Sequence, residues 1–346
     1  MASDKRYMPL RKSLFSASVQ EEILNVLWEA SEGHESMTPY LEFHQQRARR
    51  PRLDGSAEPS AKSYSDAVSI ATAILAGASR DNILARQQQI VSATRYMYLS
   101  TAADIDHDID LCARLLTMTE VHHVESPAGL SGITAVPWTK GSLKDAFACH
   151  FCPQKTLQAD QTRLSMGFTA CNLNRIAGIG VRWTRNLADH LRFVDDDQAV
   201  FIFHCASFLQ VQKSLNNSPF PETFIEETLK SIALLFPPHD KKTASWLKGH
   251  PDIDPQLPRC DSLERHKHRI GDFDYWHDRL VILQQVLDES SPLTLSQRWH
   301  DTRNCLRWYT FWIAIPLFAI TVFFGLVQSV EAAVQIYLSC KRVESG

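Results

Sequence analysis

The chain has 346 residues, a formal net charge of −3 and a hydrophobic content of 44%. These values are ordinary for a globular protein, and they exclude a strongly basic nucleic-acid binder. The mean hydropathy is slightly negative, which excludes a protein that crosses a membrane many times. The eight cysteines lack the spacing of a disulfide framework, so we expect a reducing, cytosolic compartment.

Residues 1–63 are predicted to be largely disordered, with one short helix. Glu21–Glu29 has the apolar spacing of an amphipathic helix. Residues 34–63 mix Pro, Ser, Gly and arginine with little periodicity, which is typical of a mobile loop. The basic N-terminus is not followed by an apolar run, so no cleaved signal peptide is expected.

Residues 64–258 are predicted to form an all-α cytosolic bundle. Helical periodicity covers three early segments: Tyr64–Ala78, Asn82–Leu99 and Leu111–Met118. A loop follows, with one short strand expected around Ile133–Val136. The block Leu164–Val211 is predicted to be mostly helical, with turns at Gly178–Gly180 and Asp195–Asp197.

The last part of the predicted bundle contains clear helix start and stop signals. An amphipathic helix is expected between Pro221 and Pro237, and Asp240 is predicted to cap a short helix that ends at Gly249. Residues 259–307 are predicted to form stalk helices. Their apolar side chains step by three and four, which favours a contact face for a partner: Phe273, Trp276, Leu280, Leu283 and Leu287.

A membrane span is predicted at Trp308–Val330, which contains no Asp, Glu, Lys or Arg. As a helix these residues would extend about 34 Å, enough to cross a hydrocarbon core of roughly 30 Å. Trp308, Tyr309 and Trp312 suit the headgroup layer at the entry side. With a short tail at residues 331–346, this is the layout of a tail-anchored, single-pass protein whose N-terminal domain is cytosolic.

The span also contains a row of small residues. Gly325, Ser329 and Ala333 recur every fourth position, which lets two helices approach closely. We therefore expect membrane lipids as partners, together with a second copy or another membrane protein. The alternative is an amphipathic extension lying at the membrane interface.

An acidic run and two Asp–His pairs are weighed as sites of chemistry. The run consists of Asp104, Asp106, Asp108 and Asp110; on a strand it could hold Ca²⁺ or Mg²⁺, but it more simply forms a helix N-terminus. His204–Cys205 is considered only as a second pair of zinc ligands, and adjacent residues on a helix diverge. The Asp–His pairs are Asp189–His190 and His277–Asp278, and no nucleophile elbow or phosphate loop accompanies them. We expect hydrogen-bonding roles for them.

A cysteine motif and two basic clusters complete the candidates. Cys149, His150 and Cys152 lack a second ligand pair, so buried cysteine is favoured over a zinc site. The basic residues could touch anionic lipid or remain solvated: Arg47, Arg49, Arg50 and Arg52, then Arg265–Arg269. No catalytic residue, metal or cofactor is assigned.

Several stretches resemble a set of filamentous-fungal proteins without an assigned biochemical role, in which a helical cytosolic region precedes one C-terminal transmembrane helix. The shared patterns lie at Tyr275–Leu280, Trp308–Trp312, Phe323–Ser329, Phe168–Phe193 and Ser231–Pro237. Pro316 within the span departs from the pattern and predicts a kink. The resemblance implies an origin and an anchor, but no activity.

The expected function is that of a membrane-anchored interaction or scaffold protein that presents a helical cytosolic domain at an endomembrane. One alternative is a membrane-bound enzyme or accessory factor of a fungal biosynthetic pathway, using the acidic run with Asp189 and His190. Another is a lipid-contacting protein with an apolar groove.

Overall fold

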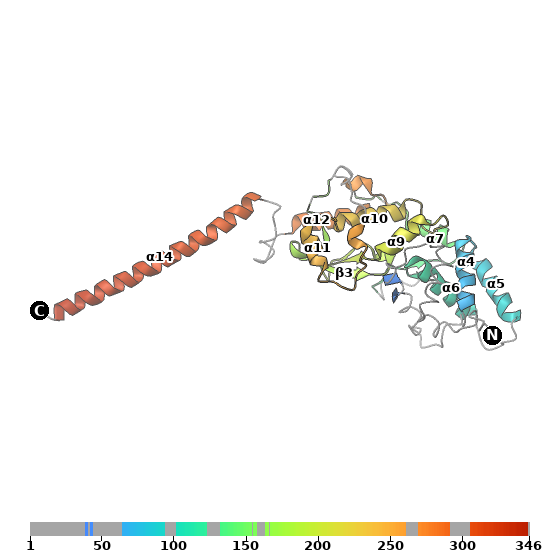
Figure 1. Cartoon of the computed structure of the whole chain (residues 1–346), viewed down its shortest axis with the longest axis horizontal. Helices are drawn as coiled ribbons and strands as arrows, with labels where there is room; N and C mark the ends of the chain where they lie inside the picture. The colour runs from blue at the N-terminus through green and yellow to red at the C-terminus, as the bar shows by residue number, and fades with distance from the viewer. Residues whose placement is uncertain are drawn as a thin grey trace. The chain divides into compact units, whose positions relative to one another are not determined.

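The computed structural model describes residues 39–40, 42–43, 64–93, 102–122, 132–153, 155–157, 163–165, 167–260, 269–290 and 305–344. The described residues up to Glu289, apart from Arg175–Gly178, belong to one compact unit. The C-terminal helix belongs to a second unit, which is treated separately below. Figure 1 gives the element labels used from here on.

Helices make up most of the fold, and three of them begin the larger unit. They pack on one another, with α6 in contact with both neighbours: α4 (Tyr64–Leu75), α5 (Arg80–Ala93) and α6 (Ala102–Thr117). The first two confirm the helices expected in this region. The third begins nine residues before Leu111 and takes in the whole acidic run.

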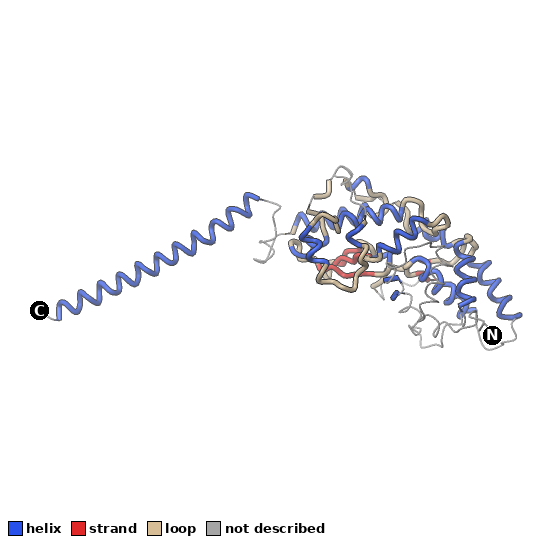
Figure 2. The backbone as a smooth tube through the Cα atoms, viewed as in Figure 1, coloured by secondary structure: helices blue, strands red, loops and turns tan. Residues whose placement is uncertain are grey.

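Two small sheets lie within this unit, drawn in red in Figure 2. The first pairs β1 (Val121–His122) in parallel with β2 (Val136–Pro137), close to the strand expected there. The second has the order β3-β5-β4, formed by Gly180–Thr184, Ala199–Phe203 and Arg192–Val194. In it β5 runs parallel to β3 and antiparallel to β4.

The expected all-α class is therefore correct only as a mainly helical fold, and the block Leu164–Val211 is where it is wrong. This block holds α8 (Ala170–Arg175) and three strands before its last helix begins. The central strand β5, with the sequence AVFIF, is a short apolar run buried at four of its five positions. Such a run fits a buried strand and a buried helix turn equally well, so periodicity could not distinguish them.

The remaining helices of the unit complete its core. Their bounds are α7 (Leu143–His150), α9 (Ala206–Ser214), α10 (Phe224–Leu235), α11 (Lys241–Leu247) and α12 (His277–Glu289), with 3-10 turns η3 (Leu187–Asp189), η4 (Leu257–Arg259) and η6 (Ile270–Asp272). The structure confirms α10 between its prolines. It also confirms the cap of α11, because the Asp240 carboxylate accepts hydrogen bonds from the backbone N–H groups of Lys242 and Thr243 at 3.1 Å each.

The described part of the predicted stalk up to Glu289 belongs to the larger unit. The five side chains of its apolar face are at most 2% exposed: Phe273, Trp276, Leu280, Leu283 and Leu287. They pack inside the larger unit, where α12 contacts β4 and η6. The periodicity was correct, but the partner of this face is the protein's own core.

Two residues in the loop expected to be mobile are anchored to the body. The Tyr40 hydroxyl donates a hydrogen bond to the Leu115 carbonyl oxygen at 3.0 Å, and its ring stacks on Phe208 with centroids 5.9 Å apart. Phe43 is also buried. The expected helix at Glu21–Glu29 lies outside the described residues.

The C-terminal helix α14 (Cys305–Glu344) is 40 residues long. Within it, Trp312–Ile336 is long and apolar enough to cross a membrane, and none of the most apolar stretch is buried. The helix continues through Pro316 and beyond Val330, so residues 331–344 are helical instead of a separate tail. Strong helix formers follow Glu331, and residues 331–345 contain no Gly or Pro, which explains this continuation.

Candidate functional site

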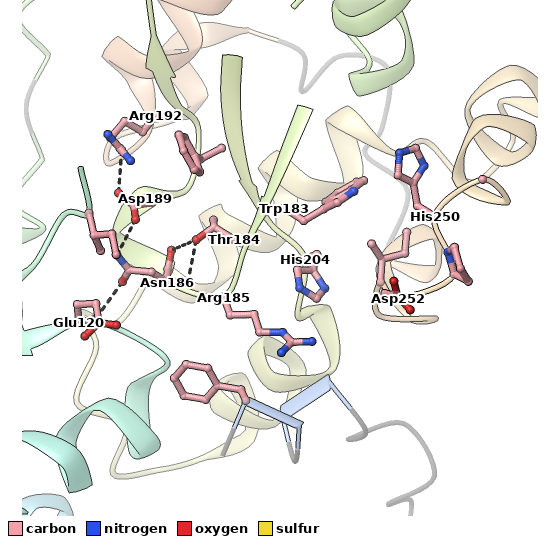
Figure 3. A pocket seen from close by; sticks show the side chains of 16 residues that line it. Glu120, Trp183, Thr184, Arg185, Asn186, Asp189, Arg192, His204, His250 and Asp252 are labelled. Atoms are coloured by element: carbon pink, nitrogen blue, oxygen red, sulfur yellow. Dashed lines mark hydrogen bonds and ion pairs between the residues drawn. The ribbon is translucent and has the colours of Figure 1, made fainter. Parts of the chain in front are cut away.

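A pocket of about 540 Å³ opens where the parallel strands β3 and β5 end (Figure 3). Arg185 and Asn186 directly follow β3, and His204 directly follows β5. The loop after α11, Gly249–Ile253, supplies another part of the wall. Side chains that follow neighbouring parallel strands converge at one sheet edge, which is where ligands commonly bind in such sheets.

The first part of this pocket, called here the polar half, consists of Glu120, Asn186, Asp189 and Arg192. The Asn186 amide donates to Asp189 Oδ2 at 2.8 Å, and its oxygen accepts from the Glu120 backbone N–H at 2.9 Å. Asp189 Oδ1 forms an ion pair with Arg192 Nε at 2.8 Å. The network connects η3 with β1 and β4, so its side chains hold the sheet edge together.

The second part, called here the aromatic half, consists of Trp183, Arg185, His204, His250 and Asp252. Both imidazoles stand edge-on to the indole, with centroid distances of 6.2 Å from Trp183 to His204 and 5.6 Å to His250. The buried indole Nε1 of Trp183 has no hydrogen-bond acceptor among the described residues. This half is therefore less completely bonded than the polar half.

Burial keeps His204 uncharged at neutral pH. Desolvation, assisted by the nearby positive charge of Arg185, lowers the pKa of His204 to about 4. Burial also raises the pKa of Cys205, whose Sγ lies 4.0 Å from His204 Nδ1. A protonated thiol can donate to Nδ1, which leaves the proton of His204 on Nε2.

His250 presents the opposite pattern. Its Nδ1 lies 3.2 Å from the Trp246 carbonyl oxygen. A carbonyl only accepts, so Nδ1 carries the proton and Nε2 of a neutral ring is an acceptor. The aromatic half thus combines a cation, an imidazole donor and an imidazole acceptor.

The acidic run lies on the helix α6 and does not form a strand face. Arg80, 3% exposed, pairs with Asp106 and with Asp110 at 2.8 Å each. Its guanidinium also lies 5.0 Å from the Trp138 ring centroid. These two carboxylates serve an internal ion-pair cluster that joins α5 to α6.

The residues expected to form hydrogen bonds do so at His190. The ring accepts from the Phe203 backbone N–H through Nδ1 at 3.2 Å, so Nε2 donates to Ser231 Oγ at 2.8 Å. Burial, with the nearby Arg279, lowers the pKa of His190 to about 3. His190 is a neutral core group, and with Asp189 it is committed to structural bonds.

The pair His277–Asp278 also has a structural role. Asp278 accepts hydrogen bonds from the backbone N–H groups of Thr156 and Leu157 at 3.1 and 3.2 Å, and from the Thr156 hydroxyl. These bonds, together with one from His277, lower the pKa of Asp278 to about 2 against the opposing effect of desolvation. The carboxylate fastens residues 155–157 to α12.

The cysteine motif lies at the end of α7, with Cys149 exposed and Cys152 partly exposed, so the expectation that these cysteines are buried is wrong. Within the described ranges, no group of three or more His, Cys, Asp or Glu side chains is arranged to hold a metal ion. The first basic cluster and residues 265–268 lie outside the described residues, as does the side chain of Trp308.

On α14, Tyr309 is exposed and Trp312 is partly exposed. A Cβ added at Gly325 would meet no atom within 4 Å, and the Ser329 hydroxyl donates to the Gly325 carbonyl oxygen at 2.9 Å. Ala333 is exposed. The row of small residues therefore presents an open surface on its helix, and its role as a packing face stays a prediction.

Comparison with protein-family models, with curated proteins and with solved structures finds no match. The pocket therefore has to be interpreted from its own geometry. The sequence did not predict Trp183, Arg185 and His250 as site residues, because they come together only at the edge of the folded sheet. The available signal was a polar residue directly after each apolar strand.

Proposed function

We propose that the chain is a single-pass membrane protein and that α14 holds the larger unit at a membrane surface, where it acts as an interaction or scaffold module. The observation that carries this proposal is the segment Trp312–Ile336, whose most apolar stretch is unburied. At 1.5 Å per residue it extends about 37 Å, and a modest tilt fits that length into a core of roughly 30 Å.

The exposed surface of this segment supports a lipid environment. Its large aliphatic and phenylalanine side chains from Ile313 to Ile336 are between 38% and 72% exposed, and they include Phe318, Phe323, Phe324 and Leu326. A contiguous apolar surface of this kind is rare on soluble monomers and marks contact with lipid or with a partner. Lipid can cover the apolar side chains on all sides of the helix, whereas one partner protein would cover a single face.

We place the larger unit on the cytosolic side of an endomembrane. The exposed Cys149 and the buried Cys205 of this unit form no disulfide. Free thiols persist in a reducing compartment and are oxidised in the secretory lumen. Glycosylation acceptors added at each end would test this orientation: only the C-terminal acceptor should be modified.

Alkaline extraction of cell membranes tests the anchor. The wild-type chain should stay in the membrane pellet, whereas Ile320→Arg with Phe324→Arg should move it to the supernatant, because each arginine costs about 2.5–3.5 kcal/mol near a helix centre. The matched control places the same two arginines at the exposed Gln88 and Gln89 of α5. A wild-type chain that is released by alkali would refute the anchor.

A further inference from the structure

The side chain of Arg185 has fewer partners than the other partly buried arginines of the unit. Its Nη2 bonds Glu42 Oε2 at 2.8 Å, and no other hydrogen bond reaches the guanidinium from the described residues. Arg192, by contrast, bonds both Asp189 and the Gly132 carbonyl oxygen. Because a guanidinium carries five N–H donors, Arg185 retains most of its capacity.

The partner of Arg185 is also easily displaced. The side chain of Glu42 is 52% exposed, while that of Arg185 is 20% exposed. An ion pair with one solvated member contributes little to stability. A ligand that brings its own anionic group into the pocket can therefore share or replace this contact.

The surroundings of Arg185 suit a ring attached to that anion. In Figure 3 the Arg185 side chain extends from the end of β3 toward His204. The indole of Trp183 and the ring of His250 form an aromatic wall, with ring centroids 5.6 Å apart. The volume of about 540 Å³ lies within the range of small-molecule pockets.

We propose that the aromatic half of the pocket binds a small aromatic carboxylate. The carboxylate accepts hydrogen bonds from the guanidinium of Arg185 and from Nε2–H of His204, and the ring lies along Trp183. Asp252, exposed at the rim, opposes the bound charge weakly because solvent screens it. This ligand fits the donors and the aromatic wall together, which a simple inorganic anion does not.

Calorimetric titration of the full chain in a non-ionic detergent tests this proposal, with detergent alone as the blank. The probes are 2-naphthoate, its neutral analogue 2-naphthamide and inorganic phosphate. We expect saturable binding of naphthoate with a Kd below about 1 mM, and binding at least about tenfold weaker for the amide and for phosphate. Equal affinity for naphthoate and naphthamide, or no saturation by naphthoate, would overturn the proposal.

Two charge-removing variants provide the matched comparison. Arg185→Gln should weaken naphthoate binding at least about tenfold, whereas Arg182→Gln within β3 should leave it within about twofold. Arg182 pairs with Asp197 at 3.1 Å, and both side chains are about half exposed. Equal effects of the two variants would contradict the proposal.

A substitution at the rim of the pocket should change naphthoate affinity in the opposite direction from Arg185→Gln. Asp252→Asn removes a like charge and should strengthen naphthoate binding by about twofold at low salt, with the difference shrinking as salt is added. Weaker binding by this variant would contradict the proposed position of the carboxylate. Melting temperatures of all variants, measured in the same detergent, show whether each one is folded.

Discussion

The Glu227 carboxylate accepts a hydrogen bond from the backbone N–H of Trp276 at 2.8 Å, although the two residues are 49 positions apart in the chain. The same carboxylate accepts from the backbone N–H groups of Asp274 and Tyr275, also at 2.8 Å each. These three N–H groups lie directly before the first turn of α12. Without the carboxylate they would have no hydrogen-bond acceptor. A side chain of α10 thus caps α12 from a distance, while its burial raises the pKa of Glu227.

The first prediction concerns this cap. Glu227→Ala should lower the free energy of unfolding by about 3 kcal/mol, because one buried and two partly buried N–H groups lose a charged acceptor. Glu227→Gln retains one oxygen and should cost about half as much. Denaturant unfolding of the full chain in detergent measures both. The neighbouring Glu226, half exposed and paired with Lys213, is the control position; its change to Gln should cost less than about 0.5 kcal/mol.

The second prediction tests whether the apolar face of α12 is internal. Leu280 is fully buried and Ile282 on the same helix is 40% exposed. Leu280→Ala should lower the free energy of unfolding by about 2–5 kcal/mol, whereas Ile282→Ala should change it by less than about 1 kcal/mol. Similar small effects at both positions would mean that this face is free, as expected of a stalk.

The third prediction concerns the ion-pair cluster of Arg80. Arg80→Ala removes the cation that pairs with Asp106 and with the buried Asp110, so it should cost about 3–5 kcal/mol of stability. Arg86→Ala, at an exposed position of the same helix, should cost less than about 0.5 kcal/mol. Thermal unfolding followed by near-ultraviolet circular dichroism reports both variants. A loss for Arg80→Ala as small as that of the control would show that the cluster is not stabilising.

The fourth prediction is a pH dependence of stability. The pKa values of His190 and His204 are lowered from 6.5 to about 3 and about 4. The unfolded chain binds protons at these groups below pH 6.5, and the folded chain does not. The free energy of unfolding should therefore fall as the pH falls from 6.5 toward 4, by up to about 1.4 kcal/mol per pH unit for each histidine.

A pair of variants separates this titration from a loss of packing. His190→Gln should flatten the pH slope between pH 6.5 and 4, because one titrating group is gone. Ser231→Ala removes the hydrogen-bond partner of His190 but keeps the imidazole, so stability should fall while the slope persists. If both variants kept the wild-type slope, the burial of His190 would not be the cause of the pH dependence of stability.

Local signals made part of the fold predictable. Prolines on either side of α10 and the carboxylate of Asp240 before α11 act within one or two turns, so they could be identified without the rest of the chain. The strands β3 and β5 could not, because a five-residue apolar run becomes a strand only when a partner supplies its hydrogen bonds. The pocket depends on those strands, so its residues could not be assembled from spacing alone.

The sequence by itself determined that the chain ends in an apolar helix long enough to cross a membrane, because length and composition decide that property residue by residue. It also determined the periodicity of α12. Only the tertiary structure decided that this apolar face belongs to the core, that His190 is a buried neutral group, and that Arg185 lies beside His204 and Trp183. These relationships join residues far apart in the chain, and packing, desolvation and charge pairing act through space.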